Sequence, residues 1–164
     1  MRLHLGCANK RKNGWINIDI RQTSVTDVVA PIQQLPYDDQ SVDAIYCRHT
    51  LEHLAPQDAA AAVVEWARVL RDGGQLQVIV PNLVYHARQI IRGRDRDLRR
   101  ALNSIYGHRD PSRGGDVEDA HRWGYVRSSL QQLLEERGFI DVRAADSGSD
   151  LHPKHLNLLA VRKV

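Results

Sequence analysis

The 164-residue sequence has no hydrophobic run long enough to cross a bilayer. A membrane-spanning helix needs roughly 18 or more consecutive apolar residues, and no segment approaches this length. The N-terminal segment MRLHLGCANKRK also lacks the apolar centre of a signal peptide. We therefore expect a soluble, cytoplasmic protein without a membrane partner.

Cysteine is scarce as well. The only two, Cys7 and Cys47, do not form a CxxC pair, and each lies next to a predicted strand. A disulfide framework or a zinc knuckle needs more cysteines at close, repeated spacing. We exclude both classes and expect two reduced thiols.

No large excess of one charge is present. The sequence has 23 Lys and Arg against 20 Asp and Glu, a net charge of +3, and the basic excess lies in its second half. Nucleic-acid-binding domains usually carry a clustered basic face, whereas residues 92–97 interleave arginine with aspartate. A nucleic-acid-binding module is therefore a secondary alternative. The length, with 42% hydrophobic residues, suits one domain over residues 1–164.

The first half predicts a sheet with one well-marked helix. Short apolar or alternating runs predict strands at residues 2–5, 16–20, 41–47 and 75–80. The helix begins near Pro56 and is stopped by Gly73–Gly74. Its apolar positions recur at helical spacing and are Val63, Trp66, Ala67 and Leu70. A strand, a helix and a strand in this order predict a parallel pair with a right-handed connection.

The second half predicts further helices around a long polar loop. Residues 84–105 form either one kinked helix or two, because Gly93 interrupts the pattern. The turn-rich segment 107–124 is expected to be a loop, and we assign residues 84–127 as a lid or substrate segment.

The C-terminal end predicts one more helix and two strands. Ser128 caps the helix, Gly138 ends it, and Leu130, Leu133 and Leu134 face inward. The strands are residues 140–144 and 155–161. The whole pattern predicts an α/β fold, Rossmann-like and doubly wound, with a mostly parallel sheet.

The ends of the first two strands point to a nucleotide-type ligand. Gly6 follows the first strand, and a residue without a side chain lets the backbone approach a ligand closely. Asp19 ends the second strand, where a carboxylate can accept hydrogen bonds from both hydroxyls of a ribose. Together they predict an adenosyl-type site. The alternative is a hairpin at Asn13–Gly14 between the same two strands.

Several segments resemble one family. The sequence is similar to the small, type-11-like branch of the class I S-adenosylmethionine-dependent methyltransferases. The segments that carry this resemblance are Leu3–Ala8, Gly14–Asp19, Leu35–Leu54, Arg68–Asn82 and His121–Tyr125. The resemblance implies S-adenosylmethionine as cofactor, S-adenosylhomocysteine as product, and an antiparallel C-terminal strand in the sheet.

The resemblance also implies where the cofactor binds. It assigns the methionine end to the backbone of Gly6, Cys7 and Ala8, and the ribose to Asp19. The other cofactor-binding positions that it assigns are Ile20, Ile32, Gln33, Arg48 and His49. Within this set, residues 32 and 33 lie beside the adenine, and residues 48 and 49 lie close to the sulfonium.

The sequence departs from the family pattern in four places. Ala8 stands where glycine is usual, and alanine fits there if its backbone angles stay in the ordinary regions. Ala30–Pro31 replaces an acidic residue that commonly meets the adenine amino group. The connection from Gly6 to Trp15 leaves room only for a short helical turn. The N-terminal helix is absent, so one sheet face is expected to be partly bare and a homodimer is a candidate assembly.

The polar segment supplies the candidates for the acceptor side. If the acceptor is a hydroxyl, a general base removes its proton, and we assign His121, with His108 and Tyr106 as alternatives. Arginine can pair with phosphate or carboxylate, and the substrate-binding candidates are Arg109, Arg122, Trp123 and Tyr125, with Arg113 as a further arginine. Family analogy indicates a small-molecule acceptor such as a sugar or a nucleotide-linked saccharide. A cofactor-binding protein that has lost catalysis is the alternative.

Two histidine motifs raise the question of a metal. His49–His53 matches the HxxEH pattern of inverted zinc peptidases, but it follows a predicted strand instead of lying within a long helix. We therefore take Glu52 and His53 as residues that fix the following turn. His152 and His155 are interpreted as ordinary loop residues, and we assign no metal ion.

Overall fold

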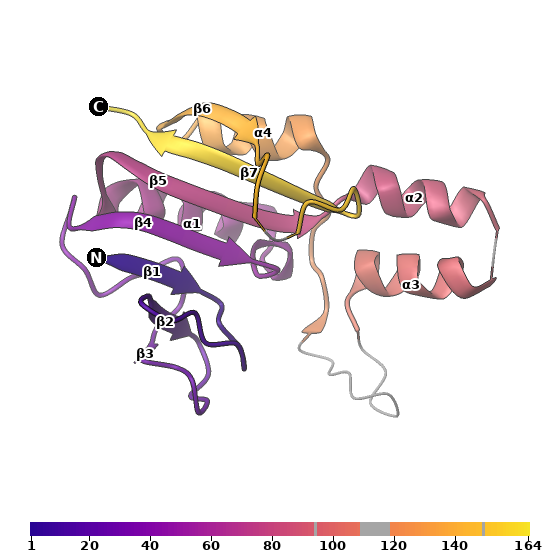
Figure 1. Ribbon diagram of the computed structural model, residues 1–164, viewed down its shortest axis with the longest axis horizontal. Helices are drawn as coiled ribbons and strands as arrows, with labels where there is room; N and C mark the ends of the chain where they lie inside the picture. Colours follow the sequence, from indigo (N-terminus) through magenta and orange to yellow (C-terminus); the bar gives the residue numbers. More distant parts are fainter. Residues whose placement is uncertain (94, 109–118, 149) are drawn as a thin grey trace.

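The computed structural model describes residues 1–93, 95–108, 119–148 and 150–164. These residues form a seven-stranded sheet in the order β3-β2-β1-β4-β5-β7-β6, with helices beside it and beyond one end (Figure 1). The parallel strands are β3 (Val28–Val29), β2 (Ile16–Asp19), β1 (Arg2–Leu5), β4 (Val42–Arg48) and β5 (Leu70–Pro81). The antiparallel strands are β7 (His155–Arg162) and β6 (Phe139–Ala144). The predicted Rossmann-like, mostly parallel sheet with an antiparallel C-terminal end is confirmed.

The strand order reverses direction at β1, which lies between β2 and β4. Ligands of open α/β sheets bind at such a switch point, outside the carboxyl ends of the strands. Because β1 and β2 pair in parallel, the hairpin at Asn13–Gly14 is excluded. The expected short helical turn is also wrong, since residues 6–15 connect the two strands through turns and coil.

Helix α1 (Pro56–Val69) begins as predicted, with Pro56 in its first turn. Its end differs from the prediction, because the chain turns extended at Leu70 and does not continue to the two glycines. Leu70 already pairs with Val42 of β4, and the register then shifts, so Gly73 and its neighbours form a bulge inside β5. Gly73 has a φ of 71°, a conformation that suits glycine at this bulge. Pairing of Leu70 with β4, and not the pair of glycines, therefore ends the helix.

The segment after β5 forms two separate helices and not one helix kinked at Gly93. These are α2 (Leu83–Ile91) and α3 (Asp95–Tyr106). The side chain of Asn82 caps α2 by accepting a hydrogen bond from the backbone N–H of Tyr85. Both helices lie beyond the carboxyl ends of the parallel strands (Figure 1). This is the end of the sheet at which the predicted cofactor residues lie.

Helix α4 (Arg127–Glu135) starts one residue before the predicted cap. Ser128 therefore lies within the first turn, and Ser129 makes the terminal contact by accepting a hydrogen bond from the N–H of Val126 at 3.1 Å. Leu130 and Leu134 are fully buried, as predicted. The prediction of the helix is confirmed, and the assignment of its cap is wrong.

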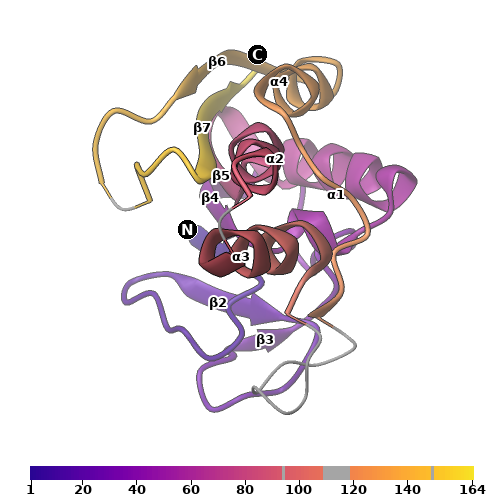
Figure 2. The same ribbon diagram turned by 90° about the vertical axis from the view of Figure 1, so that its right-hand side faces the viewer.

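Both α1 and α4 pack against the same face of the sheet (Figure 2). The strand residues that alternate away from these helices are largely polar and pair with one another. His4 contacts Asn17 across β1 and β2, and Gln77 donates to Asn157 across β5 and β7, both at 2.9 Å. No helix of the described residues is both long and apolar enough to span a membrane.

Candidate active site

A pocket of about 180 Å³ opens at the carboxyl ends of β1, β2 and β3. Its lining comprises Gly6, Asp19, Ile20, Ala30, Pro31, Ile32, Gln33, Thr50, His53 and Leu54. Gly6, Asp19, Ile20, Ile32 and Gln33 are predicted cofactor positions, and the structure brings them together although they come from three strand ends. Pro31 was expected only as the replacement of an acidic partner, and Thr50, His53 and Leu54 were not predicted to line the site.

Asp19 is a fixed carboxylate at the edge of this pocket. Asp19 as a whole is 6% exposed. Its Oδ2 accepts a hydrogen bond from the N–H of Ala8 at 2.8 Å, and its Oδ1 accepts one from the N–H of Arg21 at 3.0 Å. These contacts hold the tip of β2 against the loop after β1. The hydroxyls of a bound ribose would donate to carboxylate oxygens that already accept hydrogen bonds from these two backbone N–H groups.

The loop after β1 has left-handed backbone at both Gly6 and Ala8, with φ of 66° and 46°. The condition under which alanine would fit is therefore not met, because Ala8 lies outside the ordinary regions. At Gly6 a Cβ atom would lie 2.0 Å from Oγ1 of Thr50. The space beside Gly6 is thus filled by Thr50, and only glycine permits this packing.

The remaining predicted cofactor residues lie outside the pocket lining. Cys7 is buried, and burial raises the pKa of its thiol. Arg48 donates two hydrogen bonds of 2.8 Å to the carboxylate of Asp150. His49 has a φ of 51°, and its Nδ1 lies 3.1 Å from Oε1 of Glu52. The side chains of Arg48 and His49 are therefore held by residues other than those of the pocket.

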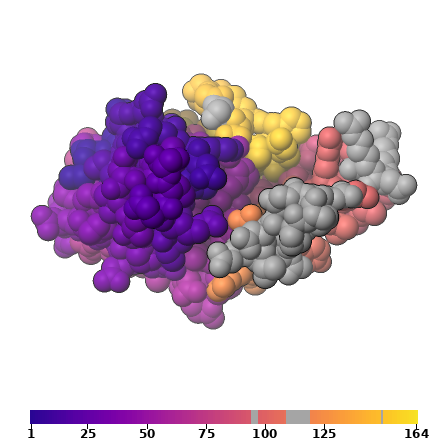
Figure 3. Space-filling model, turned by 90° about the horizontal axis from the view of Figure 1, so that it is seen from below, coloured from indigo at the N-terminus to yellow at the C-terminus, as the bar shows by residue number. Residues whose placement is uncertain are grey.

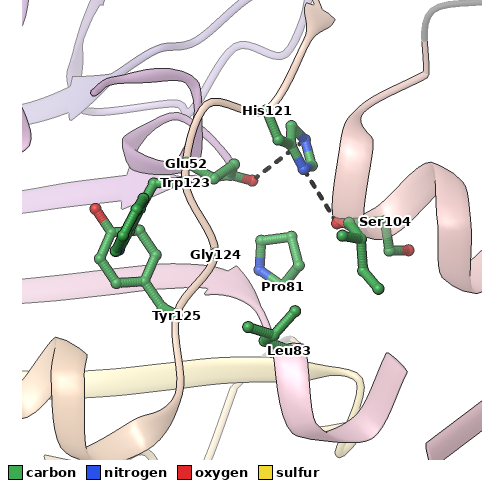
Figure 4. Close-up of a pocket in the computed structure, with 9 residues that line it drawn as sticks. Glu52, Pro81, Leu83, Ser104, His121, Trp123, Gly124 and Tyr125 are labelled. Carbon is green, nitrogen blue, oxygen red and sulfur yellow. Dashed lines mark hydrogen bonds and ion pairs between the residues drawn. The ribbon is translucent and has the colours of Figure 1, made fainter. Parts of the chain in front are cut away.

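Glu52 lies in the short 3-10 helix η1 (Leu51–His53) and is almost completely buried, at 1% exposure. Its Oε1 lies 4.0 Å from Nε2 of His121. Nδ1 of His121 lies 3.0 Å from the backbone carbonyl oxygen of Ser104 (Figure 4). A carbonyl only accepts hydrogen bonds, so Nδ1 carries the proton and Nε2 faces Glu52.

His53 completes a group that we call the Glu52 cluster, which consists of Glu52, His53 and His121. The rings of His53 and His121 meet edge to face, with centroids 4.8 Å apart. Because His53 also lines the pocket, the cluster adjoins the predicted cofactor site. The assignment of Glu52 and His53 to the turn alone is therefore incomplete. The zinc-peptidase interpretation does not fit, because His49 ends a strand region and η1 has only three residues.

Backbone hydrogen bonds join the segment after residue 119 to η1. The carbonyl of Glu52 accepts from the N–H groups of Arg122 and Trp123, at 2.8 and 3.1 Å. On the face shown in Figure 3, orange residues of this segment adjoin the purple N-terminal half. Burial lowers the pKa of His121, while the nearby carboxylate of Glu52 acts in the opposite direction. The structure thus places His121 beside η1.

The other acceptor-side candidates differ in position. Tyr106 is 57% exposed, and Trp123 is 49% exposed. His108 is half-buried and Arg122 is exposed. Tyr125, at 3% exposure, is a buried residue and has no exposed ring to offer a substrate. Arg109 and Arg113 lie outside the described residues.

Two further cavities lie near Ser104, whose carbonyl contacts His121 of the Glu52 cluster. A small one of about 10 Å³ is lined by residues that include Glu52, Ser104, His121 and Tyr125 (Figure 4). A larger groove of about 570 Å³ shares Ser104 with it. The groove is lined by Tyr85, His86, Gln89, Asp97, Arg100, Ala101, Asn103, Ser104, His152 and Lys154. The sequence pattern did not indicate this groove, because its residues come from α2, α3 and the segment before β7.

Comparison with known proteins agrees with the fold. Residues 5–78 match the family described as "Methyltransferase domain". A search of curated proteins finds no match. Among solved structures, the chain is similar to a SAM-dependent methyltransferase from Archaeoglobus fulgidus, with 16% identity, a TM-score of 0.65, and 98% of this chain and 85% of that chain covered.

Two other solved structures show the same fold. One is a SAM-dependent methyltransferase from Methanosarcina mazei, with 16% identity, a TM-score of 0.63, and 99% of this chain and 92% of that one covered. The other belongs to a complex between the Haloferax volcanii Trm112 methyltransferase activator and a methyltransferase. There the identity is 16%, the TM-score is 0.62, and the coverage is 99% of this chain and 82% of that one.

Proposed function

We propose that this chain, whose residues 5–78 match a methyltransferase domain, is a class I S-adenosylmethionine-dependent methyltransferase and that it methylates a hydroxyl of a small, anionic molecule. The observation that carries the proposal is the pocket at the strand switch point, which is lined by predicted cofactor residues from three strand ends. The groove of α2 and α3 supports the acceptor assignment.

The residues of the pocket fit the adenosine part of the cofactor. Asp19 offers a carboxylate for ribose hydroxyls, Ile20 and Ile32 offer apolar surface for a flat ring, and Gln33 offers an amide. The pocket is smaller than the roughly 300–1,000 Å³ of typical ligand sites, so the methionine part would extend beyond it. When bound, the cofactor supplies an electrophilic methyl group on a sulfonium.

The groove lined by α2 and α3 suits an acceptor that carries phosphate or carboxylate. Arg100 and Lys154 supply two positive charges, and His152, whose Nδ1 accepts from the N–H of Lys154, offers its Nε2–H as a donor. Asp97 adds a carboxylate that can bind a hydroxyl. A sugar phosphate or a nucleotide-linked saccharide has this combination of groups. We propose that residues 84–127 form the acceptor-binding segment, with Arg122 and Trp123 at its edge.

For a hydroxyl acceptor, proton removal falls to the Glu52 cluster. Of the three predicted bases, His121 alone has its side chain held between a buried carboxylate and a backbone carbonyl. Tyr106 and His108 carry no comparable arrangement among the described contacts. The protein's own contribution is then to orient the acceptor oxygen and to exclude water.

Calorimetric titration with S-adenosylmethionine and S-adenosylhomocysteine tests the cofactor assignment. Asp19→Asn keeps the size of the side chain and removes its charge. Because hydrogen bonds to charged groups contribute roughly 1.5–3 kcal/mol, we expect cofactor binding to weaken about tenfold or more. Asp146→Asn, at an exposed position, serves as the control and should bind like the parent protein.

Two results would contradict the proposal. Equal affinity of Asp19→Asn and the parent would remove the ribose assignment, and absence of any heat with either cofactor would favour the nucleic-acid-binding alternative. Product formation across a panel of sugar phosphates and nucleotide sugars then separates a working enzyme from a cofactor-binding protein that has lost catalysis.

A further inference from the structure

The Glu52 cluster lies between the cofactor pocket and the acceptor groove, and its side chains face one another. Glu52, His53 and His121 each offer one donor atom, and these atoms all lie within 4.8 Å of one another. A first-row metal ion with bonds of about 2.0–2.2 Å needs donor atoms roughly 3.0–3.5 Å apart. The widest of these separations would have to close by roughly 1.3–1.8 Å for the three donors to reach that spacing.

The orientation of His121 is that of a metal ligand. Its Nδ1–H donates to the carbonyl of Ser104, which leaves the lone pair of Nε2 facing a carboxylate oxygen of Glu52 at 4.0 Å. Two acceptors that face each other repel unless a cation lies between them. Metal-binding histidines usually donate their other N–H to a backbone carbonyl or a carboxylate, as His121 does here.

The carboxylate of Glu52 is buried without a matching cation. Its ion pairs with described residues are both to histidines, His49 and His121. Its Oε2 and the hydroxyl of Tyr125 are buried and have no hydrogen-bond partner among the described residues. Burial of an unpaired carboxylate is costly. The small cavity lined by these two residues and by His121 has the size of a single small species.

A second group in the structure offers similar donors but is less suited to a cation. His49, Asp150 and His155 also have donor atoms within 4.8 Å of one another. Arg48, however, already pairs with both oxygens of Asp150 at 2.8 Å. This guanidinium neutralises the carboxylate and would repel a metal ion. The Glu52 cluster has no such competitor among its described contacts.

We propose that Glu52, His53 and His121 bind a divalent transition-metal ion of the zinc type. Two imidazole nitrogens and one carboxylate are a ligand set that zinc accepts, with a fourth position open to an exogenous oxygen. The side chain of His49 orients Glu52 through its Nδ1 contact. No metal ion was expected from the sequence, because the HxxEH motif follows a strand and does not lie within a long helix. The structure adds His121, which comes from a distant segment.

The catalytic role of this metal rests on the proposed function. The acceptor hydroxyl binds at the open position, and the metal lowers its pKa so that its proton passes to solvent water. The resulting oxygen attacks the methyl carbon and forms the new C–O bond. The C–S bond breaks, and its electron pair stays on sulfur. His121 is then a metal ligand and not the base. The metal ion takes over the task of promoting loss of the hydroxyl proton.

Metal binding is measurable without any acceptor. After treatment with a chelator, the full chain is titrated with Zn²⁺ by calorimetry and with Co²⁺ by visible absorption, which reports nitrogen and oxygen ligation directly. We expect one equivalent to bind, with at least tenfold weaker binding in Glu52→Gln and in His121→Ala. Asp146→Asn, which removes an exposed carboxylate outside both pockets, should bind the metal as the parent does.

Each outcome decides the assignment. Circular dichroism confirms that the variants fold, and His53→Ala is used in place of Glu52→Gln if the latter does not. Absence of Zn²⁺ binding and of a Co²⁺ spectrum overturns the proposal, as does binding that survives these substitutions and is lost in His155→Ala. Cofactor affinity is measured separately in chelator-treated protein, so failure of the metal site is distinguished from failure of the cofactor site.

Discussion

Ala8 holds its backbone in a region that residues with a side chain rarely adopt, with a φ of 46°. The conformation is kept because the N–H of Ala8 donates to Asp19, which ties the loop after β1 to the tip of β2. A non-glycine residue in this region costs roughly 1–2 kcal/mol. The strain therefore lies within the proposed cofactor site and is offset by a contact that shapes it.

Replacing Ala8 by glycine should relieve this strain. Allowing for the greater freedom of glycine in the unfolded chain, we expect Ala8→Gly to raise the free energy of unfolding by about 0.5 kcal/mol, measured by urea denaturation. Ala61→Gly, on the exposed side of α1, is the matched control and should lower it by about 0.5–1 kcal/mol. An equal loss in both variants would contradict the argument.

Single residues were predictable from the sequence where local chemistry determines them. Gly6 and Asp19 follow strands and have types that suit a nucleotide site, and both line the pocket. Glu52 was noticed only as part of the HxxEH motif, because its neighbour His121 approaches it from a distant segment. Thr50 was missed for a similar reason, since its role is to fill the space beside Gly6.

At the scale of elements, the boundaries were the least predictable feature. The period of apolar residues located α1 and α4, but pairing of Leu70 with β4 ended α1 before its glycines. At the start of α4 the side-chain contact is made by Ser129 and not by Ser128. The reason is that the isolated bridge between Asn82 and Tyr125 determines where the chain enters the helix. Contacts between elements, which a local pattern does not contain, decided both ends.

The start of α4 gives a test of this correction. Ser129 both accepts from the N–H of Val126 and donates to its carbonyl. Loss of a side-chain contact at a helix start costs about 1 kcal/mol, so Ser129→Ala should lower the free energy of unfolding by that amount. Ser128→Ala, exposed in the first turn, should change it by less than about 0.5 kcal/mol. The reverse order in denaturant unfolding would restore Ser128 as the cap.

Over the whole molecule, the sheet is covered by helices on one face among the described residues (Figure 2). The expectation of a partly bare face is met in this sense. The face is nevertheless polar, with His4 against Asn17 and with Lys12 over the rings of Trp15 and Tyr46. Polar side chains of this kind can remain in contact with water.

Buried histidines make the stability of the whole fold sensitive to acid. Burial lowers the pKa of His4 and His86, and lowers that of His155 to about 4. Unfolding restores these values toward 6.5, so the unfolded chain binds more protons between these limits. The stability is therefore fully present above pH 6.5 and falls as the pH is lowered toward 4.

Urea denaturation in the presence of a chelator measures this effect. Between pH 7.5 and 4.5 we expect the free energy of unfolding to fall by about 2 kcal/mol or more. His155→Gln, which removes one titrating group, should show a smaller fall. The pairing of Asp150 with Arg48 lowers the pKa of that carboxyl to about 2, so its contribution is lost only below pH 4. A flat profile from pH 7.5 to 4.5 would contradict the argument.

The backbone carbonyl of Glu52 connects two parts of the candidate site. The main-chain oxygen of Glu52 receives both Arg122 and Trp123, while the neighbouring His53 borders the pocket at the strand ends. The proposed acceptor segment and the wall of the proposed nucleotide pocket are therefore joined through the backbone of η1. We therefore expect a displacement of either one on ligand binding to move the other.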